Sequence, residues 1–143
     1  MNFQNSIKTC FKKYATFSGR ASRSEFWFFV LFYYAVIILS VLFISQTKSY
    51  GPGMIFMFGF ALIALFPYLG VTIRRLHDIN QPGTWVGAAI IASIVSRIPN
   101  LYLVGIISLG LNIIILILCA KDGDKKNNRF GKNIYNKKRK KRR

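Results

Sequence analysis

The chain has 143 residues, of which 52% are hydrophobic and 17% are charged. This balance excludes an ordinary soluble domain, because soluble chains carry about a quarter charged residues. The net charge of +17 suits either nucleic acid or an anionic membrane surface. Twelve of the 21 basic residues fall in the last 23 positions, directly after an apolar run. This position makes anionic lipid the expected partner and nucleic acid the less favoured one.

Residues 2–17 are predicted to form an amphipathic helix. Apolar residues recur there every three or four positions, and Lys8, Lys12 and Lys13 lie mostly between them. The pattern is typical of a helix lying in the membrane interface, and it equally suits a helix packed on the rest of the protein. Gly19 is expected to end this helix. No small-residue cleavage site follows the first apolar run, so we expect that run to be retained rather than removed as a signal peptide.

A second helix is predicted to begin near residue 22. Ser22 and Glu25 have the spacing of a capping box, in which each side chain satisfies a backbone N–H of the other residue. Residues 26–45 then carry no charge, and twenty helical residues measure about 30 Å, enough to cross the hydrocarbon core. Trp27 lies at the start, where aromatic rings favour the headgroup level. Residues 48–53, which include Gly-Pro-Gly, are interpreted as a loop.

The remaining apolar residues are predicted to form three further spans. The second span covers residues 54–73. Residues 85–120 are too numerous for a single crossing, and the Arg-Ile-Pro-Asn sequence at 97–100 divides them. Two spans result, at about 84–98 and 101–120. Because the first of these is short, a re-entrant hairpin remains an alternative to a full crossing.

The distribution of charge predicts the orientation in the membrane. With the N-terminus in the cytoplasm, 19 basic residues lie inside and only Lys48 and Arg97 lie outside. Four crossings then also place the C-terminus in the cytoplasm. We therefore expect an all-α integral membrane protein with a single membrane domain at 1–133. Residues 134–143 are expected to form a disordered basic tail, because its like charges repel.

The polar residues between the spans are expected to gather at the inner membrane face. Unpaired charge is costly there, so Arg74 or Arg75 is expected to pair with Asp78, and Arg20 or Arg23 with Glu25. The cluster that could bind a lipid headgroup or a partner comprises Arg20, Arg23, Glu25, Arg74, Arg75, His77, Asp78 and Arg129. Structural roles are expected for Ser22, Trp27, Pro82, Gly83, Trp85 and Asn112.

Three stretches resemble a known family. They are Phe-Ser-Gly-Arg-Ala-Ser-Arg-Ser-Glu-Phe-Trp at 17–27, Arg-Arg-Leu-His-Asp at 74–78 with Trp85 after the turn, and Asn-Arg-Phe-Gly at 128–131. Their order, with apolar segments between them, is similar over residues 5–133 to the small bacterial inner-membrane proteins grouped as domain of unknown function 805, the YhaH-like proteins. The resemblance implies an integral inner-membrane protein of bacteria, and it implies no activity.

The chain departs from the family pattern at two places. Val86 stands where the family usually has a second tryptophan. The family's closing Pro-Asp-Pro is replaced by Asp-Gly-Asp-Lys-Lys at 122–126 and the basic tail. These departures leave open whether a role of the C-terminal loop that the family shares applies to this chain.

The function that the residues favour is a non-enzymatic membrane module that binds anionic lipid or a partner, which includes another copy of the chain. A small oligomeric transporter or channel subunit is the alternative, with Asn112 as the polar residue to test. A weaker hypothesis is a lipid-directed enzyme with His77 as base. One histidine and the distant Cys10 and Cys119 do not supply a metal site, and we expect no cofactor.

Overall fold

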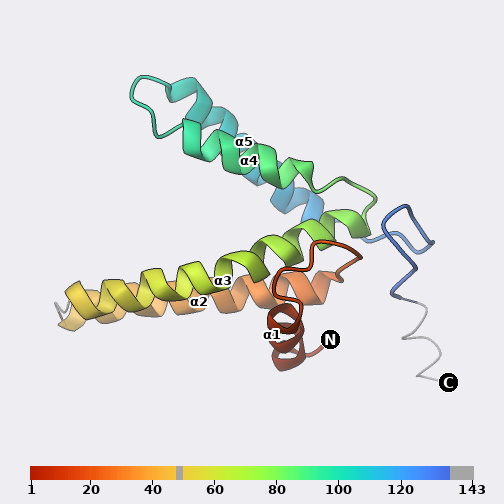
Figure 1. The fold of residues 1–143 in the computed structure, drawn as a ribbon, viewed down its shortest axis with the longest axis horizontal. Coiled ribbons are helices and arrows are strands. Elements are labelled where there is room, and N and C mark those ends of the chain that lie inside the picture. The colour runs from red at the N-terminus through yellow and green to blue at the C-terminus, as the bar shows by residue number, and fades with distance from the viewer. Residues whose placement is uncertain (48–49, 136–143) are drawn as a thin grey trace. The chain divides into compact units, whose positions relative to one another are not determined.

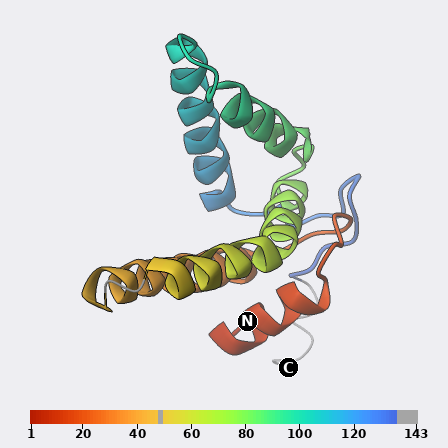
Figure 2. The same ribbon diagram turned by 60° about the vertical axis from the view of Figure 1, so that its left-hand side comes forward.

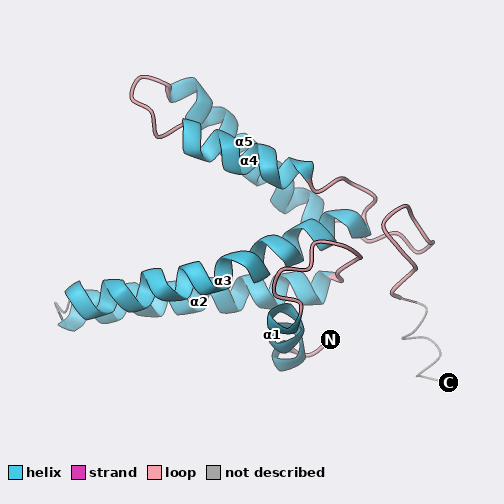
Figure 3. Cartoon of the chain, viewed as in Figure 1, coloured by secondary structure: helices cyan, strands magenta, loops and turns pink. Residues whose placement is uncertain are grey.

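The computed structural model describes residues 1–47 and 50–135. Within these residues the chain is helical apart from loops and one isolated bridge between Asn128 and Gly131 (Figure 3). The helices are α1 (Phe3–Lys12), α2 (Arg23–Thr47), α3 (Tyr50–Asp78), α4 (Thr84–Val95) and α5 (Tyr102–Ala120) (Figure 1). The chain divides into two compact units: Met1–Thr16 with Ser24–Val71, and Phe17–Arg23 with the chain from Thr72 onward.

Three helices are long and apolar enough to cross a membrane. They are α2, α3 and α5, with 25, 29 and 19 residues. Their outward side chains are apolar and strongly exposed: Leu39 is 65% exposed, Ile55 75% and Leu103 76%. So much exposed apolar surface is unfavourable in water, and it suits contact with lipid chains. The prediction of long apolar helices at these three places is confirmed.

The fourth predicted span, at 84–98, contains a shorter helix. Helix α4 has 12 residues, and at 1.5 Å per residue it measures about 18 Å, well short of a hydrocarbon core of about 30 Å. The structure therefore provides three long apolar helices and one short one in its described part. The re-entrant hairpin and the full crossing both remain predictions for this segment.

In the first unit, α2 and α3 run antiparallel and side by side (Figures 1 and 2). The rings of Tyr33 and Tyr68 lie 5.1 Å apart between centroids. Near the other end of the pair, a Cβ on Gly53 would collide with the side chain of Ile44. Gly53 thus permits a close approach of the two helices that a larger residue would prevent.

Helix α1 packs on the start of α2. Ser6 and Cys10, four residues apart on one helix face, are fully buried. Phe3 contacts Phe28 of α2 edge to face, with ring centroids 5.9 Å apart. The packed helix is therefore the interpretation that the structure supports, and Lys8, on the opposite face, is exposed.

Two predicted boundaries of helices were wrong. Helix α1 ends at Lys12 rather than at residue 17, and Gly19 (φ +85°) lies in the following loop, where its positive φ serves a turn. Helix α3 begins at Tyr50, so the predicted loop at 48–53 is helical from residue 50. Pro52 fits the first turn of a helix because its missing N–H would have no partner there anyway.

In the second unit, α4 and α5 form an antiparallel hairpin (Figure 2). The predicted break at 97–100 is confirmed, because α4 ends at Val95, α5 begins at Tyr102 and Asn100 adopts a positive φ of 67°. A hydrogen bond of 2.8 Å joins the hydroxyls of Ser93 and Ser108 across the hairpin. Asn112, for which a structural role is predicted, donates through its amide to Ser108 O at 2.8 Å within its own helix.

Candidate functional site

The candidate site lies in the second unit, where helix α3 ends. Asn80 adopts a left-handed conformation (φ 59°), and Gln81 N donates to Leu76 O at 2.9 Å while Asn80 N donates to His77 O at 3.1 Å. These two bonds form the Schellman motif that commonly ends helices. Arg-Arg-Leu-His-Asp at 74–78 is thus the last part of α3, whereas the sequence analysis placed the end of the span just before Arg74.

The Pro82-Gly83 turn follows, and it leads directly into α4. A Cβ on Gly83 would lie 2.7 Å from Cγ2 of Ile73, so only glycine allows the chain to pass so close to α3. Trp85, at the start of α4, is 37% exposed. The predicted structural role of the turn has a specific cause here, which is contact of its backbone with α3.

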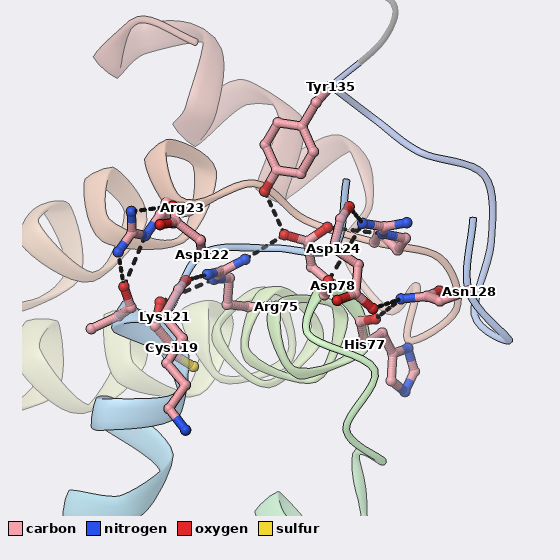
Figure 4. Close-up of polar contacts among 12 residues, drawn as sticks. Arg23, Arg75, His77, Asp78, Cys119, Lys121, Asp122, Asp124, Asn128 and Tyr135 are labelled. Carbon is pink, nitrogen blue, oxygen red and sulfur yellow. Dashed lines mark hydrogen bonds and ion pairs between the residues drawn. The ribbon is translucent and has the colours of Figure 1, made fainter. Parts of the chain in front are cut away.

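Asp78 is the centre of the site. Its side chain is fully buried, and its carboxylate accepts hydrogen bonds from Arg20 Nε at 2.8 Å, from the Arg75 guanidinium and from the Tyr135 hydroxyl at 2.5 Å (Figure 4). The side chains of Arg20 and Arg75 are 1% and 0% exposed. One carboxylate thus serves two buried cations that come from separate segments of the chain.

The arginines also cap the end of α5. Arg75 Nε donates to Cys119 O at 3.0 Å, and its Nη2 donates to Lys121 O. Arg23 Nε donates to Ala120 O at 2.8 Å. The last carbonyls of a helix lack partners within the helix and carry partial negative charge, so cationic donors stabilise them. This capping explains why a positive side chain, that of Arg75, is buried at this place.

Arg20 connects the end of α3 to the chain after α5. Its Nη1 donates to Lys126 O at 2.8 Å, and its Nη2 donates to Asp124 O. Asp124 N in turn donates to Asp78 O at 2.8 Å. The segment that follows α5 is therefore fixed to α3 through its backbone, which leaves its side chains available for other contacts.

His77 holds a second part of the same segment. Its ring stacks on Phe130 with centroids 3.9 Å apart and an angle of 4° between the planes. Asn128 Nδ2 donates to His77 O at 2.9 Å. His77 Nδ1 lies 3.2 Å from Gly19 O, and because a carbonyl only accepts, Nδ1 carries the proton. His77 thus clamps two loops together.

Residues 124–135 form a closed loop that we call the cationic loop. It starts at Asp124, bonded to Asp78 O, and it returns to the Asp78 carboxylate at Tyr135. A Cβ on Gly123 would overlap both the Asp78 carboxylate and the Tyr135 hydroxyl, so glycine is required where the two ends converge. The exposed cations of the loop are Lys125, Lys126, Arg129 and Lys132.

The environment of Tyr135 shifts its titration. Burial raises the pKa of Tyr135 to about 12, and the hydrogen bond to Asp78 and the negative charge of Asp78 act in the same direction. The phenol therefore stays protonated, and a donor to Asp78, at pH values above the ordinary pKa of tyrosine, 10.0.

One of the predicted ion pairs is present, and two of the arginines have carboxylate partners other than the predicted one. The pair of Arg75 with Asp78 is confirmed. The carboxylates that contact Arg20 and Arg23 are Asp78 and Asp122, whereas the sequence had suggested Glu25. The pair of Arg23 with Asp122 is 2.6 Å long and largely exposed, so it contributes little free energy.

The other predicted site residues have diverse positions. Arg74 is buried at the end of α3, and Glu25 is buried in the first unit. Ser22 directly precedes the first helical residue of α2, the position that a capping box requires. Trp27 is 39% exposed on α2. Arg129 lies over the ring of Phe130, 4.7 Å from its centroid, and donates to Asn80 O at 3.2 Å.

Sequence reasoning missed the residues that close the cationic loop. Tyr135 was counted in the basic tail predicted at 134–143, and residues 136–143 of that tail lie outside the described residues. Gly123 was read only as part of a turn. The one available signal was Gly-Asp at 123–124 and Asn-Asn at 127–128. These residue types are typical of a tight loop but do not indicate its attachment to Asp78.

The chemistry of the site is that of hydrogen bonding and charge. Among the described residues, no group of three or more His, Cys, Asp or Glu side chains could hold a metal ion. His77 and Asp78 have different partners: His77 contacts Gly19 and Phe130, whereas Asp78 contacts arginines and Tyr135. Their arrangement is therefore not that of a proton-transferring pair.

Comparisons with known proteins identify the family. The model of a family described as "Protein of unknown function (DUF805)" matches residues 14–132. The chain is 37% identical over 75 residues to the inner membrane protein YhaI of Escherichia coli, a match that covers 52% of this chain and 61% of YhaI. It is 30% identical over 78 residues to the inner membrane protein YhaH of the same organism, covering 52% of this chain and 63% of YhaH. No solved structure matches. With its apolar helices and a family match over most of its length, the chain belongs to the DUF805 family of membrane proteins.

Proposed function

We propose that this protein is a non-enzymatic, multi-pass module of the bacterial inner membrane that binds anionic phospholipid through its cationic loop. The observation that carries the proposal is the combination of two features in one loop. The backbone of the loop is tied to the end of an apolar helix, and four of its side chains are exposed cations. A loop fixed at the end of a candidate span presents its charge at the level of the lipid headgroups.

The buried arginines have a different role in this proposal. Arg20, Arg23, Arg74 and Arg75 belong to the cluster that the sequence predicts to bind a headgroup or a partner. Arg20 and Arg75 are buried, and their donors face Asp78 and backbone carbonyls. A guanidinium that already has these acceptors gains little from a phosphate. We therefore transfer headgroup binding to the exposed cations of the loop and keep Arg20 and Arg75 as the framework.

The proposed orientation places both termini in the cytoplasm. Two observations support it: the excess of basic residues in the segments that would then lie inside, and the antiparallel hairpin of α4 and α5. A hairpin begins and ends at the same end, so α5 returns the chain to the side where α3 stops, whether or not α4 crosses the bilayer completely.

The transport alternative has no supporting contact in the described spans. Ser93 and Ser108 bond to each other, and Asn112 bonds to a backbone carbonyl of its own helix. These polar groups are engaged rather than arranged along a path. The lipid-directed enzyme likewise lacks support, because His77 donates through Nδ1 to a carbonyl and stacks on Phe130.

The experiment that tests the proposal is native mass spectrometry of the purified protein titrated with phosphatidylglycerol. The test variant is Lys125→Gln/Lys126→Gln/Lys132→Gln, whose side chains are exposed while their backbone contacts are retained. Each cation near a surface contributes roughly 1 kcal/mol, so the loss of three weakens binding by about a hundredfold at low salt.

The matched control is the triple arginine variant at the same three positions, which preserves the charge and is expected to bind as the wild type does. Equal binding of phosphatidylglycerol and zwitterionic phosphatidylcholine by the wild type would overturn the proposal. So would unchanged binding in the triple glutamine variant.

A further inference from the structure

The Tyr135 hydroxyl is the last contact that closes the cationic loop. It donates to Asp78 Oδ2 at 2.5 Å, and the Tyr135 ring is partly buried. The other end of the loop is fixed at Asp124, whose N–H donates to Asp78 O at 2.8 Å. A single residue, Asp78, thus holds both ends, the first through its backbone and the second through its carboxylate.

The middle of the loop is ordered by bonds between its own residues. Asn128 and Gly131 exchange two backbone bonds of 3.2 and 3.0 Å. Asn133 N donates to Asn127 Oδ1 at 2.8 Å, and Tyr135 N donates to Asn133 Oδ1 at 2.7 Å. These bonds transmit the position of Tyr135 back along the chain toward the exposed cations.

Closing the loop works against the repulsion of its charges. Four exposed cations lie within the eight residues 125–132, and like charges held close together repel. Without an attachment at its end, the segment would gain conformational freedom and its cations would spread apart. The hydrogen bond of Tyr135 with Asp78 opposes both tendencies.

From this geometry we infer that Tyr135 and Asp78 form a latch that preorganises the cations of the loop for one cluster of headgroup phosphates. Tyr135 is a positioning residue, because its hydroxyl contacts Asp78 rather than the lipid. The inference rests on the proposed function and adds a residue that controls the strength of binding. Preorganisation raises affinity by removing the cost of ordering the binding groups at the moment of binding.

Removing the latch and removing a lysine charge should change the salt dependence of lipid binding in different ways. Removing the hydroxyl leaves the number of cations unchanged, so the dependence of binding on salt should keep its slope while the affinity falls at every salt concentration. Removing lysines reduces the number of charge contacts, so the slope itself should become shallower. The two kinds of variant are therefore distinguishable in one series of titrations.

The test compares Tyr135→Phe with wild type in titrations with phosphatidylglycerol at several concentrations of ammonium acetate, read by native mass spectrometry. We expect Tyr135→Phe to bind about threefold to tenfold more weakly, with the slope of the wild type. Tyr102→Phe is the matched control, because Tyr102 is 78% exposed at the start of α5. Hydrogen exchange at the amides of Asn133 and Tyr135 should become faster in Tyr135→Phe alone.

The outcomes separate the latch from the proposed function. If the wild type binds phosphatidylglycerol and Tyr135→Phe binds it equally well, the latch is refuted while the proposed function stands. A slope reduced to that of the triple glutamine variant would also refute it, because the hydroxyl would then be acting through the number of charge contacts. If the wild type shows no preference for phosphatidylglycerol, both the proposed function and the latch fail.

Discussion

The replacement of Asp78 by asparagine is the sharpest test of the framework that holds the site. The change preserves size and removes one negative charge that Arg20, Arg75 and Tyr135 share. All three partners are donors, and the asparagine NH2 is a donor as well. Either orientation of the amide therefore directs one of its N–H groups at another donor, and two buried cations lose their counter-ion.

The expected loss of unfolding free energy follows from these contacts. Removing one partner from a buried ion pair costs roughly 3–5 kcal/mol, because the remaining charge is left uncompensated. The carbonyls of Cys119 and Lys121, which accept from Arg75, reduce the penalty without replacing the charge. We expect Asp78→Asn to lose about 3–5 kcal/mol in reversible unfolding in mixed micelles, followed by circular dichroism.

A double-mutant cycle with Tyr135→Phe checks the reasoning. Removing the hydroxyl alone should cost roughly 1.5 kcal/mol, as for a hydrogen bond to a charged group. In the Asp78→Asn background the cost should be clearly smaller, because the acceptor has changed. A loss below about 1 kcal/mol for Asp78→Asn, or strictly additive effects in the cycle, would refute the central role of the Asp78 carboxylate.

Three further predictions follow from individual contacts. Gly123→Ala should destabilise the protein by about 1–3 kcal/mol, because its Cβ meets Asp78 and Tyr135; Gly110→Ala, where a Cβ meets nothing within 4 Å, should be tolerated in the same unfolding assay. Ser93→Ala should cost about 0.6 kcal/mol through loss of the bond to Ser108, and a loss above 2 kcal/mol would show that more than this bond is involved. The pKa of Tyr135 is raised from 10.0 to about 12, so its contribution to stability should be complete below pH 10 and lost as the pH rises toward 12. When the free energy of unfolding is measured against pH, Tyr135→Phe should lack this loss. An identical loss in that variant would assign it to another group.

Hydropathy and charge were sufficient to predict much of the fold, because both can be evaluated within a short stretch of sequence. An uncharged run of about twenty residues needs no tertiary information to indicate a span, and α2, α3 and α5 appear where such runs occur. The pair of Arg75 with Asp78 was also within reach, because residues three apart lie on one face of a helix. The boundaries at Lys12 and Tyr50 were missed because packing and helix-end chemistry decide them.

The candidate site depends on contacts that local patterns do not contain. Arg20 reaches a carboxylate 58 positions away, and Tyr135 reaches the same carboxylate from a segment whose composition predicts disorder. The arginines were expected to bind lipid because their type suits phosphate. The burial of Arg75 beside the carbonyls that end α5 became apparent only in three dimensions.

The most direct test of the central claim is photo-crosslinking from the cationic loop inside native membranes. A photoreactive amino acid at Asn127, an exposed and uncharged position of the loop, removes the bond from Asn133 N but keeps both attachments of the loop to Asp78. It should capture anionic phospholipid in excess of its share of the membrane. The excess should disappear when Lys125, Lys126 and Lys132 are changed to glutamine. Lipids captured in proportion to their abundance, or an excess that survives the loss of the three lysines, would contradict binding of anionic headgroups by this loop.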